Sequence, residues 1–348
     1  MGRMEKMSRM RKNDAGVSPQ TFSCTSTSNR CVQDWSRRGR RGFLFITLSV
    51  AILVAVAAVQ LACGGYSAGS SSSPNPAPTP APATFPSFSH VFLVVEENHS
   101  FTDVIGNPSM PYLNSLASKY GLAKQYFANA HPSIPNYLML TTGEMETLND
   151  NFSGTIGDDN VVRELVSAGK TWKTYQESIP SAGYLGGDAS PYVHRHNPFS
   201  LLSDVQNNPA QAANIVPFTQ FATDLANNSL PNFSFIVPDV NNDAHDGTLA
   251  TADSWLQSNI APVIASSTFQ SGGLLVILFD EGELSDFNHG GGQVPAVIVS
   301  SNSKSNFQSQ TLYQHQSTLR LVLQALGINK FPGQAETAPQ MAEFFNGH

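Results

Sequence analysis

Four short runs of almost uninterrupted apolar residues limit what this chain can fold into. HVFLVV (90–95), NFSFIV (232–237), LLVILF (274–279) and PAVIVS (295–300) are rich in Val, Ile, Leu and Phe. A strand with one face in water alternates apolar and polar residues, whereas a near-continuous apolar strand is typical of a sheet covered on both faces. The four runs therefore predict the central strands of a covered sheet.

Helix-like patterns lie between these runs. MPYLNSLASKYG (110–121) has Pro near its start and Gly at its end, NVVRELVSAGK (160–170) is amphipathic, and TLRLVLQALGI (318–328) spaces its leucines at helical intervals. A fourth pattern, 253–266, begins with Asp253 as a candidate cap. Strands alternating with helices predict an α/β three-layer sandwich with a mostly parallel central sheet, in which sites gather at the carboxyl ends of the strands.

The first 63 residues predict an export signal or a membrane anchor. Residues 1–42 contain ten Lys/Arg and three Asp/Glu, and residues 43–62 are uncharged and almost wholly apolar. A basic flank followed by an apolar run of about 20 residues is typical of a segment that enters a bilayer. Because the positive charge precedes the apolar run, we expect the residues after it to lie outside the cytoplasm, in the periplasm or cell envelope or secreted.

Two short motifs refine this expectation. Arg40 and Arg41 before the apolar run resemble a twin-arginine export signal, and QLACGG (60–65) resembles a bacterial lipoprotein cleavage box with Cys63 as the acylated residue. Gln60 departs from the aliphatic residue usual in such a box. An uncleaved N-terminal anchor is the alternative to a lipoprotein.

A linker separates this region from the folded domain. Residues 64–86 are rich in Ser, Pro and Ala and carry no charge. Such a segment has little apolar surface to bury and acts as an extended tether. We therefore expect one domain over residues 87–346, which is long enough for a single sizeable core.

The charge of the domain excludes one class of partner. The chain has 19 Lys/Arg and 26 Asp/Glu, and after residue 42 only nine basic residues remain against 23 acidic ones. Such a surface does not attract nucleic acid. The three cysteines, Cys24, Cys31 and Cys63, all precede the domain, so disulfides do not stabilise it.

Carboxylates and histidines follow three of the predicted strands. Glu97 and Asn98 follow the first strand, and Asp280 and Glu281 follow the third. The second strand is followed by further candidate ligands: Asp239, His245 and Asp246. Crowded carboxylates repel one another unless protons or cations intervene, and oxygen and imidazole groups are ligands for divalent metals. The pattern favours a metal site over the alternative, a merely acidic rim.

A candidate nucleophile lies between the first two of these strands. Ser133 stands between Pro132 and Pro135, and two prolines restrict the backbone that presents its hydroxyl. The following YLMLTTG predicts an apolar helix that ends at Gly143. A Pro-rich turn with an incidental serine is the alternative. The chain shows no G-x-S-x-G elbow here, so metal coordination is the expected activator of this serine.

Several segments in order resemble the acid phosphatase and phospholipase-C-type phosphoesterase family of the alkaline phosphatase superfamily. The closest resemblance is to short bacterial acid phosphatases, including some described as phosphatidylinositol-3-phosphatases. The matching segments are VVEENHSF (94–101), HPSIPNYL (131–138), VPDVNNDAHDG (237–247), LFDEGE (278–283) and GGGQVPAVIVS (290–300).

The resemblance implies a role for each matching residue. Ser133 matches the nucleophile and Asn136 a residue that contacts a phosphate oxygen, while His131 is open between a phosphate contact and a turn residue. His194 and His196 resemble phosphate-contacting histidines, and imidazoles there would protonate the leaving oxygen. The residues matching ligands of the nucleophile's metal are Glu97, Asn98, Asp280 and Glu281, and those placed at a second cation are Asp239, His245 and His289.

The remaining histidines and acids are assigned to other positions. Alternation along a strand sends Glu96 and Glu97 to opposite faces, and Glu97 is the chosen ligand. The side chains expected to be structural or solvated are His90, His99, His315, Asp246 and Glu283.

These observations predict an exported, metal-dependent phosphomonoesterase that acts through a phosphoserine intermediate on a small-molecule or lipid-headgroup phosphate ester. The resemblance leaves open a phosphodiesterase of phospholipase C type. A non-catalytic envelope protein that binds ligands on the same fold is a further alternative. The expected cofactor is a divalent metal ion, whose identity the mixed oxygen and nitrogen ligands do not fix.

Overall fold

The computed structural model describes residues 85–347. The predicted export region, 1–63, and the predicted linker up to residue 84 lie outside the described residues. Within 85–347, no helix is both long enough and apolar enough to cross a membrane.

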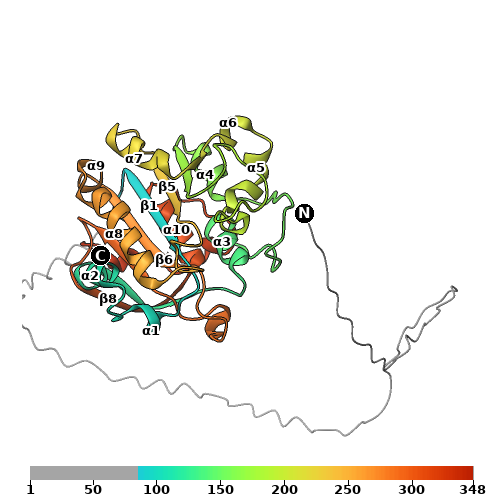
Figure 1. Ribbon diagram of the computed structural model, residues 1–348. Coiled ribbons are helices and arrows are strands. Elements are labelled where there is room, and N and C mark those ends of the chain that lie inside the picture. Colours follow the sequence, from blue (N-terminus) through green and yellow to red (C-terminus); the bar gives the residue numbers. More distant parts are fainter. Residues whose placement is uncertain (1–84, 348) are drawn as a thin grey trace, which may run out of the picture. The chain divides into compact units, whose positions relative to one another are not determined.

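An eight-stranded sheet forms the centre of the described domain (Figure 1). The strands are β1 (His90–Glu96), β2 (Gly121–Phe127), β3 (Trp172–Gln176), β4 (Ile215–Pro217), β5 (Phe233–Val237), β6 (Gly273–Phe279), β7 (Ala296–Ser300) and β8 (Phe307–Gln314). Their order is β4-β3-β5-β1-β6-β7-β2-β8, and only β7 runs antiparallel to its neighbours. The prediction of a mostly parallel α/β sheet is therefore confirmed.

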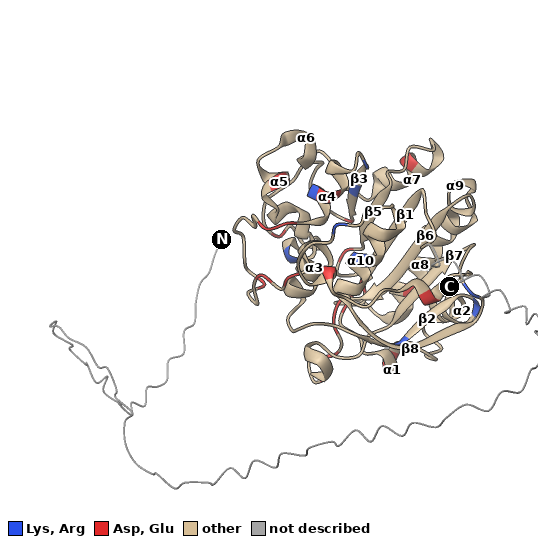
Figure 2. Ribbon diagram, turned by 180° about the vertical axis from the view of Figure 1, so that it is seen from behind, with Lys and Arg blue, Asp and Glu red and all other residues tan. Residues whose placement is uncertain are grey.

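Helices cover both faces of the sheet and complete the three layers. Helices α2, α8 and α9 pack together on the face toward the viewer in Figure 1, and α3, α4 and α10 pack together on the face toward the viewer in Figure 2. The helices are α1 (Phe101–Val104), α2 (Pro111–Lys119), α3 (Ser133–Thr142), α4 (Val161–Ser167), α5 (Ser203–Gln206), α6 (Pro209–Ala212), α7 (Thr219–Ala226), α8 (Leu249–Ala265), α9 (Ser267–Gln270) and α10 (His315–Ala325).

The four apolar runs of the sequence became β1, β5, β6 and β7, and every residue of β5, β6 and β7 is buried. Their burial follows from their place between two helical layers, where neither face of the strand meets water. The other strands carry more polar residues, as in WKTYQ of β3 and FQSQTLYQ of β8. Apolar runs in the sequence did not predict these strands. β8 is an edge strand, most of whose exposed side chains are polar, and β4 has only three residues.

The predicted cap of the fourth helix is wrong. Helix α8 begins earlier, and its cap is Thr248, whose side chain accepts a hydrogen bond from the backbone N–H of Thr251. Asp253 lies inside α8, buried, and its carboxylate accepts hydrogen bonds from the N–H groups of Tyr112 (2.9 Å) and Leu113 (2.8 Å). Asp253 thus provides hydrogen-bond acceptors for backbone N–H groups in the first turn of α2, so a residue of α8 caps that helix.

The helix predicted after Ser133 is confirmed, and it begins at that residue. Helix α3 is buried along its whole length and packs on α10. It ends at Gly143, which adopts φ 74° and donates its N–H to Met139 O (3.2 Å). A Cβ at Gly143 would lie 2.3 Å from Pro332 O, so both the left-handed backbone and the close approach of another segment require glycine there.

Replacing Gly143 by Ala should destabilise the domain by about 2–5 kcal/mol, because the left-handed conformation and the collision with Pro332 O both add cost. Gly106→Ala is the matched control, since Gly106 has φ 86° but no atom within 4 Å of its added Cβ. That variant should lose only about 1–2 kcal/mol. Chemical denaturation of both variants measures the difference, and equal losses would contradict the steric part of the argument.

Candidate active site

The carboxyl ends of three adjacent parallel strands meet at one edge of the sheet. In the order β5-β1-β6, Glu96 of β1 pairs with Phe279 of β6, so the residues that follow each strand lie side by side. The backbone N–H of Asp280 bonds Glu96 O (2.9 Å). Asn98 turns the chain with φ 54°, a left-handed conformation that Asn tolerates better than most residues, and its N–H bonds Asp280 Oδ1 (3.3 Å). The predicted convergence of strand ends is present.

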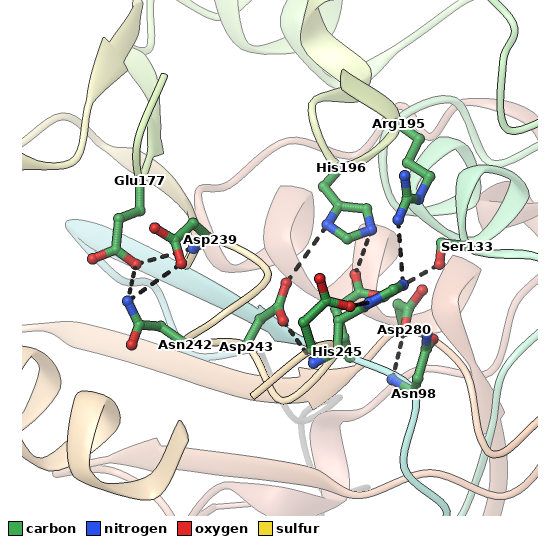
Figure 3. A network of polar contacts seen from close by, with 12 residues as sticks. Asn98, Ser133, Glu177, Arg195, His196, Asp239, Asn242, Asp243, His245 and Asp280 are labelled. Carbon is green, nitrogen blue, oxygen red and sulfur yellow. Dashed lines mark hydrogen bonds and ion pairs between the residues drawn. The ribbon is translucent and has the colours of Figure 1, made fainter. Parts of the chain in front are cut away.

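Ser133 lies at this edge as the first residue of α3. Its hydroxyl oxygen is 3.2 Å from Glu97 Oε2 and 3.2 Å from Glu281 Oε1, and only 2% of the residue is exposed. Figure 3 shows Ser133 pointing toward the same centre as Asp280 and His196. A hydroxyl between two carboxylates has an acceptor for its proton at hydrogen-bond distance.

The side chain of Asn136 holds the loop that leads into α3. Its Oδ1 accepts the N–H groups of Asn129 (2.9 Å) and Ala130 (3.2 Å), and its Nδ2 donates to Ala130 O (2.7 Å) and Pro132 O (3.3 Å). Asn136 is fully buried, and all four contacts are with the backbone of residues 129–132. The residue expected to contact phosphate thus fixes the segment that presents Ser133.

The triple glycine 290–292 packs against the same loop. Gly291 N–H bonds Ala128 O (3.2 Å), and Ala128 N–H bonds Gly292 O (2.9 Å). A Cβ on Gly291 would lie 2.4 Å from Ala130 O, so only glycine lets the two backbones approach this closely. The loop after β6 and the loop before α3 therefore form one packed unit beside the nucleophile.

The carboxyl groups around Ser133 are buried and crowd one another. Burial first, and the neighbouring carboxylates next, raise the pKa values of Glu97 and Asp280 well above their usual range. Burial likewise raises the pKa of Asp243, although the N–H of His245 bonds its Oδ1 (2.8 Å) and opposes the shift. Tyr137 donates its hydroxyl to Glu97. A cation placed among these carboxylates would therefore favour their charged forms.

Unpartnered atoms show where a cation fits. Buried polar atoms without a hydrogen-bond partner in residues 85–347 include Asn98 Oδ1, Asp243 Oδ2, Asp280 Oδ2 and His196 Nε2. Ligand atoms of Glu97, His196 and Asp243 lie within 4.8 Å of one another. Oxygen atoms with one imidazole suit several divalent metals, so this group fits a metal ion. Of the four ligands that the resemblance implied, only Glu97 belongs to the group, which His196 and Asp243 complete.

His131 is bound to the site through Glu281. Its Nδ1 is 2.6 Å from Glu281 Oε2, and its Nε2 is 2.8 Å from Asp286 O. The hydrogen bond to Glu281 raises the pKa of His131, with burial opposing it. Because both ring nitrogens are engaged, His131 orients Glu281, whose other oxygen accepts the Ser133 hydroxyl.

The two histidines of PYVHRHNPF point in different directions. His196 lies at the site, with Nε2 3.3 Å from Glu97 Oε1, Nδ1 3.6 Å from Asp243 Oδ2, and its ring stacked on Tyr137 at 4.9 Å. His194 instead bonds Ser200 Oγ through Nε2 (2.8 Å). Burial lowers the pKa of both imidazoles, most strongly for His196, and so favours their neutral forms.

The three residues expected at a second cation are not gathered around one point. In residues 85–347, the groups whose ligand atoms lie within 4.8 Å of one another are Glu97/His196/Asp243 and the more exposed His99/Asp103/Glu283.

Each of the three has other contacts. Asp239 Oδ2 accepts the Ser178 hydroxyl (2.6 Å), and His245 Nδ1 bonds Asp246 (2.7 Å). His289 is exposed, with its ring 4.2 Å from that of Phe127.

Sequence reasoning missed two residues of the site and misplaced a third. Asp243 lies in the segment that the sequence singled out, four residues after Asp239, but no periodicity showed which carboxylate turns inward. Tyr137 stood among apolar residues of a helix and gave no signal. His315 was expected to be solvated, yet it is fully buried and its Nε2 bonds Asp280 O (2.5 Å), while burial lowers its pKa to about 4.

Comparison with protein families and known sequences gives consistent results. The model of the phosphoesterase family matches residues 107–329. A phosphatidylinositol-3-phosphatase of Mycobacterium tuberculosis is 34% identical over 262 residues, covering 75% of this chain and 84% of that protein. A probable acid phosphatase of Kluyveromyces lactis is 32% identical over 251 residues, covering 68% of this chain and 58% of that protein.

Solved structures support the fold. A protein of the alkaline phosphatase superfamily from Vibrio parahaemolyticus has a TM-score of 0.51 at 14% identity, covering 74% of this chain and 72% of that one. A lipoteichoic acid synthase from Listeria monocytogenes has a TM-score of 0.51 at 13% identity, covering 71% and 73%. The expected alkaline-phosphatase-like fold is confirmed.

The raised carboxyl pKa values predict how pH affects the metal-free domain. A carboxyl whose folded pKa exceeds its unfolded value of about 4 loses its proton more readily when unfolded, so stability falls as pH rises from about 4 through the folded pKa. Thermal unfolding in chelator should show this fall, and Asp280→Asn should reduce its slope. A divalent cation that binds only the folded state should reverse it.

Glu336→Gln, at an exposed carboxylate, serves as the control and should keep the wild-type slope. If Asp280→Asn and Glu336→Gln give the same slope, and no divalent cation raises the unfolding temperature, the electrostatic account of this site is wrong.

Proposed function

The chain belongs to the phosphoesterase family, and on that basis we propose that it hydrolyses phosphate monoesters through a phosphoserine formed on Ser133. It is a phosphoric ester hydrolase, as its family and its curated relatives indicate. The observation that carries the proposal is the Ser133 hydroxyl, 3.2 Å from both Glu97 and Glu281 among buried carboxylates.

Glu97, His196 and Asp243, whose ligand atoms lie within 4.8 Å of one another, would hold a divalent metal, with the other expected ligands, Asn98, Asp280 and Glu281, close to them. Such an ion, when bound, offsets negative charge and lowers the pKa of a hydroxyl near it. The neutral imidazole of His196 favours a ligand role, because burial lowers its pKa and so disfavours the proton that a general acid must carry. His194, bonded to Ser200, would support the loop.

The proposed reaction has two steps, transfer of the phosphoryl group to Ser133 and hydrolysis of the phosphoserine. Ser133 loses its proton to a neighbouring carboxylate oxygen of Glu97 or Glu281 as Oγ attacks phosphorus. The bond from phosphorus to the ester oxygen breaks, and that oxygen takes up the proton held by the carboxyl group as the alcohol leaves. Water then attacks the phosphoserine, the bond from phosphorus to Ser133 Oγ breaks, and a proton of the water passes through the same carboxylate to Oγ as inorganic phosphate is released. His131 keeps Glu281 oriented throughout.

The named relatives support phosphate monoesters as the substrate class. The mycobacterial relative is a phosphatidylinositol-3-phosphatase, and the fungal relatives are acid phosphatases. The chain spans little more than half the length of those fungal proteins. We therefore extend to this chain only the shared chemistry, a phosphate monoester on a small molecule or a lipid headgroup.

Ser133→Ala should lower kcat/KM for p-nitrophenyl phosphate by at least about a thousandfold, because it removes the nucleophile. Ser303→Ala is the control, since this buried hydroxyl lies near the opposite edge of the sheet, beyond the end of β7. Equal activity of the two variants would exclude Ser133 as the nucleophile, and absence of turnover in the wild type would support the non-catalytic alternative. Faster turnover of bis(p-nitrophenyl) phosphate than of the monoester by the wild type would favour the phosphodiesterase instead.

We further propose that the enzyme acts outside the cytoplasm on a lipid or peptide tether. The basic and apolar segments before residue 63 and the Ser/Pro/Ala-rich residues 64–86 support this. The full-length protein should fractionate with membranes and incorporate labelled palmitate, and Cys63→Ser should abolish the labelling. Membrane binding without label in either protein would favour the uncleaved anchor, and recovery of both in the cytoplasm would exclude export.

A further inference from the structure

One guanidinium enters this acidic site. Arg195 lies in the 3₁₀ turn η1 (His194–His196), between the two histidines described above, and its side chain is 19% exposed. Figure 3 shows Arg195 directed toward His245, with Ser133 beside them and turned to the same centre. Neither the sequence motifs nor the relatives' names gave this residue a role.

Two groups orient Arg195 from different sides. Its Nη2 lies 3.2 Å from His245 Nε2, and His245 Nδ1 bonds Asp246 (2.7 Å). In the tautomer that fits both contacts, His245 Nδ1–H donates to the Asp246 carboxylate and Nε2 accepts a hydrogen bond from the guanidinium. Arg195 Nε lies 4.0 Å from Asp150 Oδ2.

Asp150 connects the guanidinium to the nucleophile helix. Its Oδ1 accepts the backbone N–H of Ile134 (3.2 Å), the residue after Ser133. The Asp150 carboxylate therefore lies between Arg195 and the first turn of α3, which places the guanidinium near the segment that presents the nucleophile.

Arg195 differs from a structural arginine of the same domain. Arg163 donates two hydrogen bonds to the Asp204 carboxylate, from Nη2 to Oδ2 (2.7 Å) and from Nε to Oδ1 (3.3 Å), so the two charges offset each other. Arg195 has no carboxylate closer than 4.0 Å, and no hydrogen bond within residues 85–347 uses its Nη1. Its charge and part of its donor fork therefore remain available to an anion.

We propose that Arg195 binds the phosphoryl oxygens of the substrate, and that Asp150 and His245 are its positioning residues. The guanidinium attracts a dianionic monoester more strongly than a monoanionic diester, since Coulomb energy scales with charge. Arg195 thus favours monoesters. This inference rests on the proposed function, because it takes phosphate esters as the substrate of the Ser133 site.

Arg195→Ala should weaken binding of inorganic phosphate by roughly 10- to 100-fold, the effect expected for hydrogen bonds to a charged group. Isothermal titration calorimetry with phosphate and a divalent cation measures this without turnover. Arg195→Lys should bind with intermediate affinity, because it keeps the charge but loses the fork. Arg163→Ala is the matched control and should bind phosphate like the wild type. Equal phosphate affinity in wild type and Arg195→Ala would overturn the proposal.

Kinetics test the selectivity. The ratio of kcat/KM for p-nitrophenyl phosphate to that for its bis ester should fall in Arg195→Ala, with KM for the monoester raised. An unchanged ratio would show that Arg195 does not favour monoesters over diesters. A wild type that turns over neither ester with any divalent cation would contradict the proposed function itself, while the calorimetry would still decide whether Arg195 binds phosphate.

A double-mutant cycle tests the positioning role of Asp150. Asp150→Asn keeps an oxygen for the Ile134 N–H but removes the charge near Arg195, and should weaken phosphate binding about two- to fivefold. In the Arg195→Ala background the same change should have no further effect. A purely structural role would give additive losses, and that result would exclude positioning through Arg195.

Discussion

Buried carboxyl groups crowded around one hydroxyl are the constraint on which the rest of this molecule depends. Burial raises the pKa values of Glu97, Asp243 and Asp280, and nearby carboxylates raise them further: Asp280 and Asp243 act on Glu97, Asp280 on Asp243, and Glu281 on Asp280. A fold tolerates such a cluster only where it can be neutralised, by protons or by a cation. The pairing of β1 and β6, which ends at Glu96 and Phe279, places the next residues, Glu97 and Asp280, side by side, while Asp243 comes from the loop after β5. The position of the site therefore follows from two things: the strand register that brings carboxylates together, and the neutralisation that these buried carboxylates require.

The nucleophile is positioned by a different part of the structure. Ser133 belongs to a helix rather than to the sheet, and its approach to the carboxylates depends on loops. The side-chain oxygen and nitrogen of Asn136 form hydrogen bonds with the backbone of residues 129–132. Gly291, which has no Cβ, allows the loop after β6 to pack directly on that segment. Because these contacts involve backbone groups, they fix the position of the Ser133 hydroxyl independently of any bound ion. The site is thus preorganised by packing, which lowers the reorganisation that a reaction would need.

The sequence revealed the parts of this site that belong to regular elements. Apolar runs identify central strands, and the rule that parallel strands end at one edge brings Glu97 and Asp280 together before any coordinates are known. Irregular segments gave no such guide. In the turn His194–His196, a hydrogen bond to Ser200 turns His194 away while Arg195 reaches His245, and in the loop after β5 the inward carboxylate is Asp243 rather than Asp239. Side-chain direction there depends on tertiary hydrogen bonds, which no sequence period encodes.

An acidic domain that binds an anionic ester poses an electrostatic question that net charge does not answer. Interactions between exposed charges fade beyond about 8 Å at physiological ionic strength, so most of the 23 acidic residues act weakly at the nucleophile. The balance at Ser133 is decided by the groups within a few ångströms. There the carboxylates surround the proposed cation site, and the guanidinium of Arg195, whose Nε lies 4.0 Å from Asp150 Oδ2, adds a positive charge near the first turn of α3. We therefore expect local positive charge inside an acidic rim to attract phosphate at short range, while the net negative charge disfavours larger polyanions such as nucleic acid.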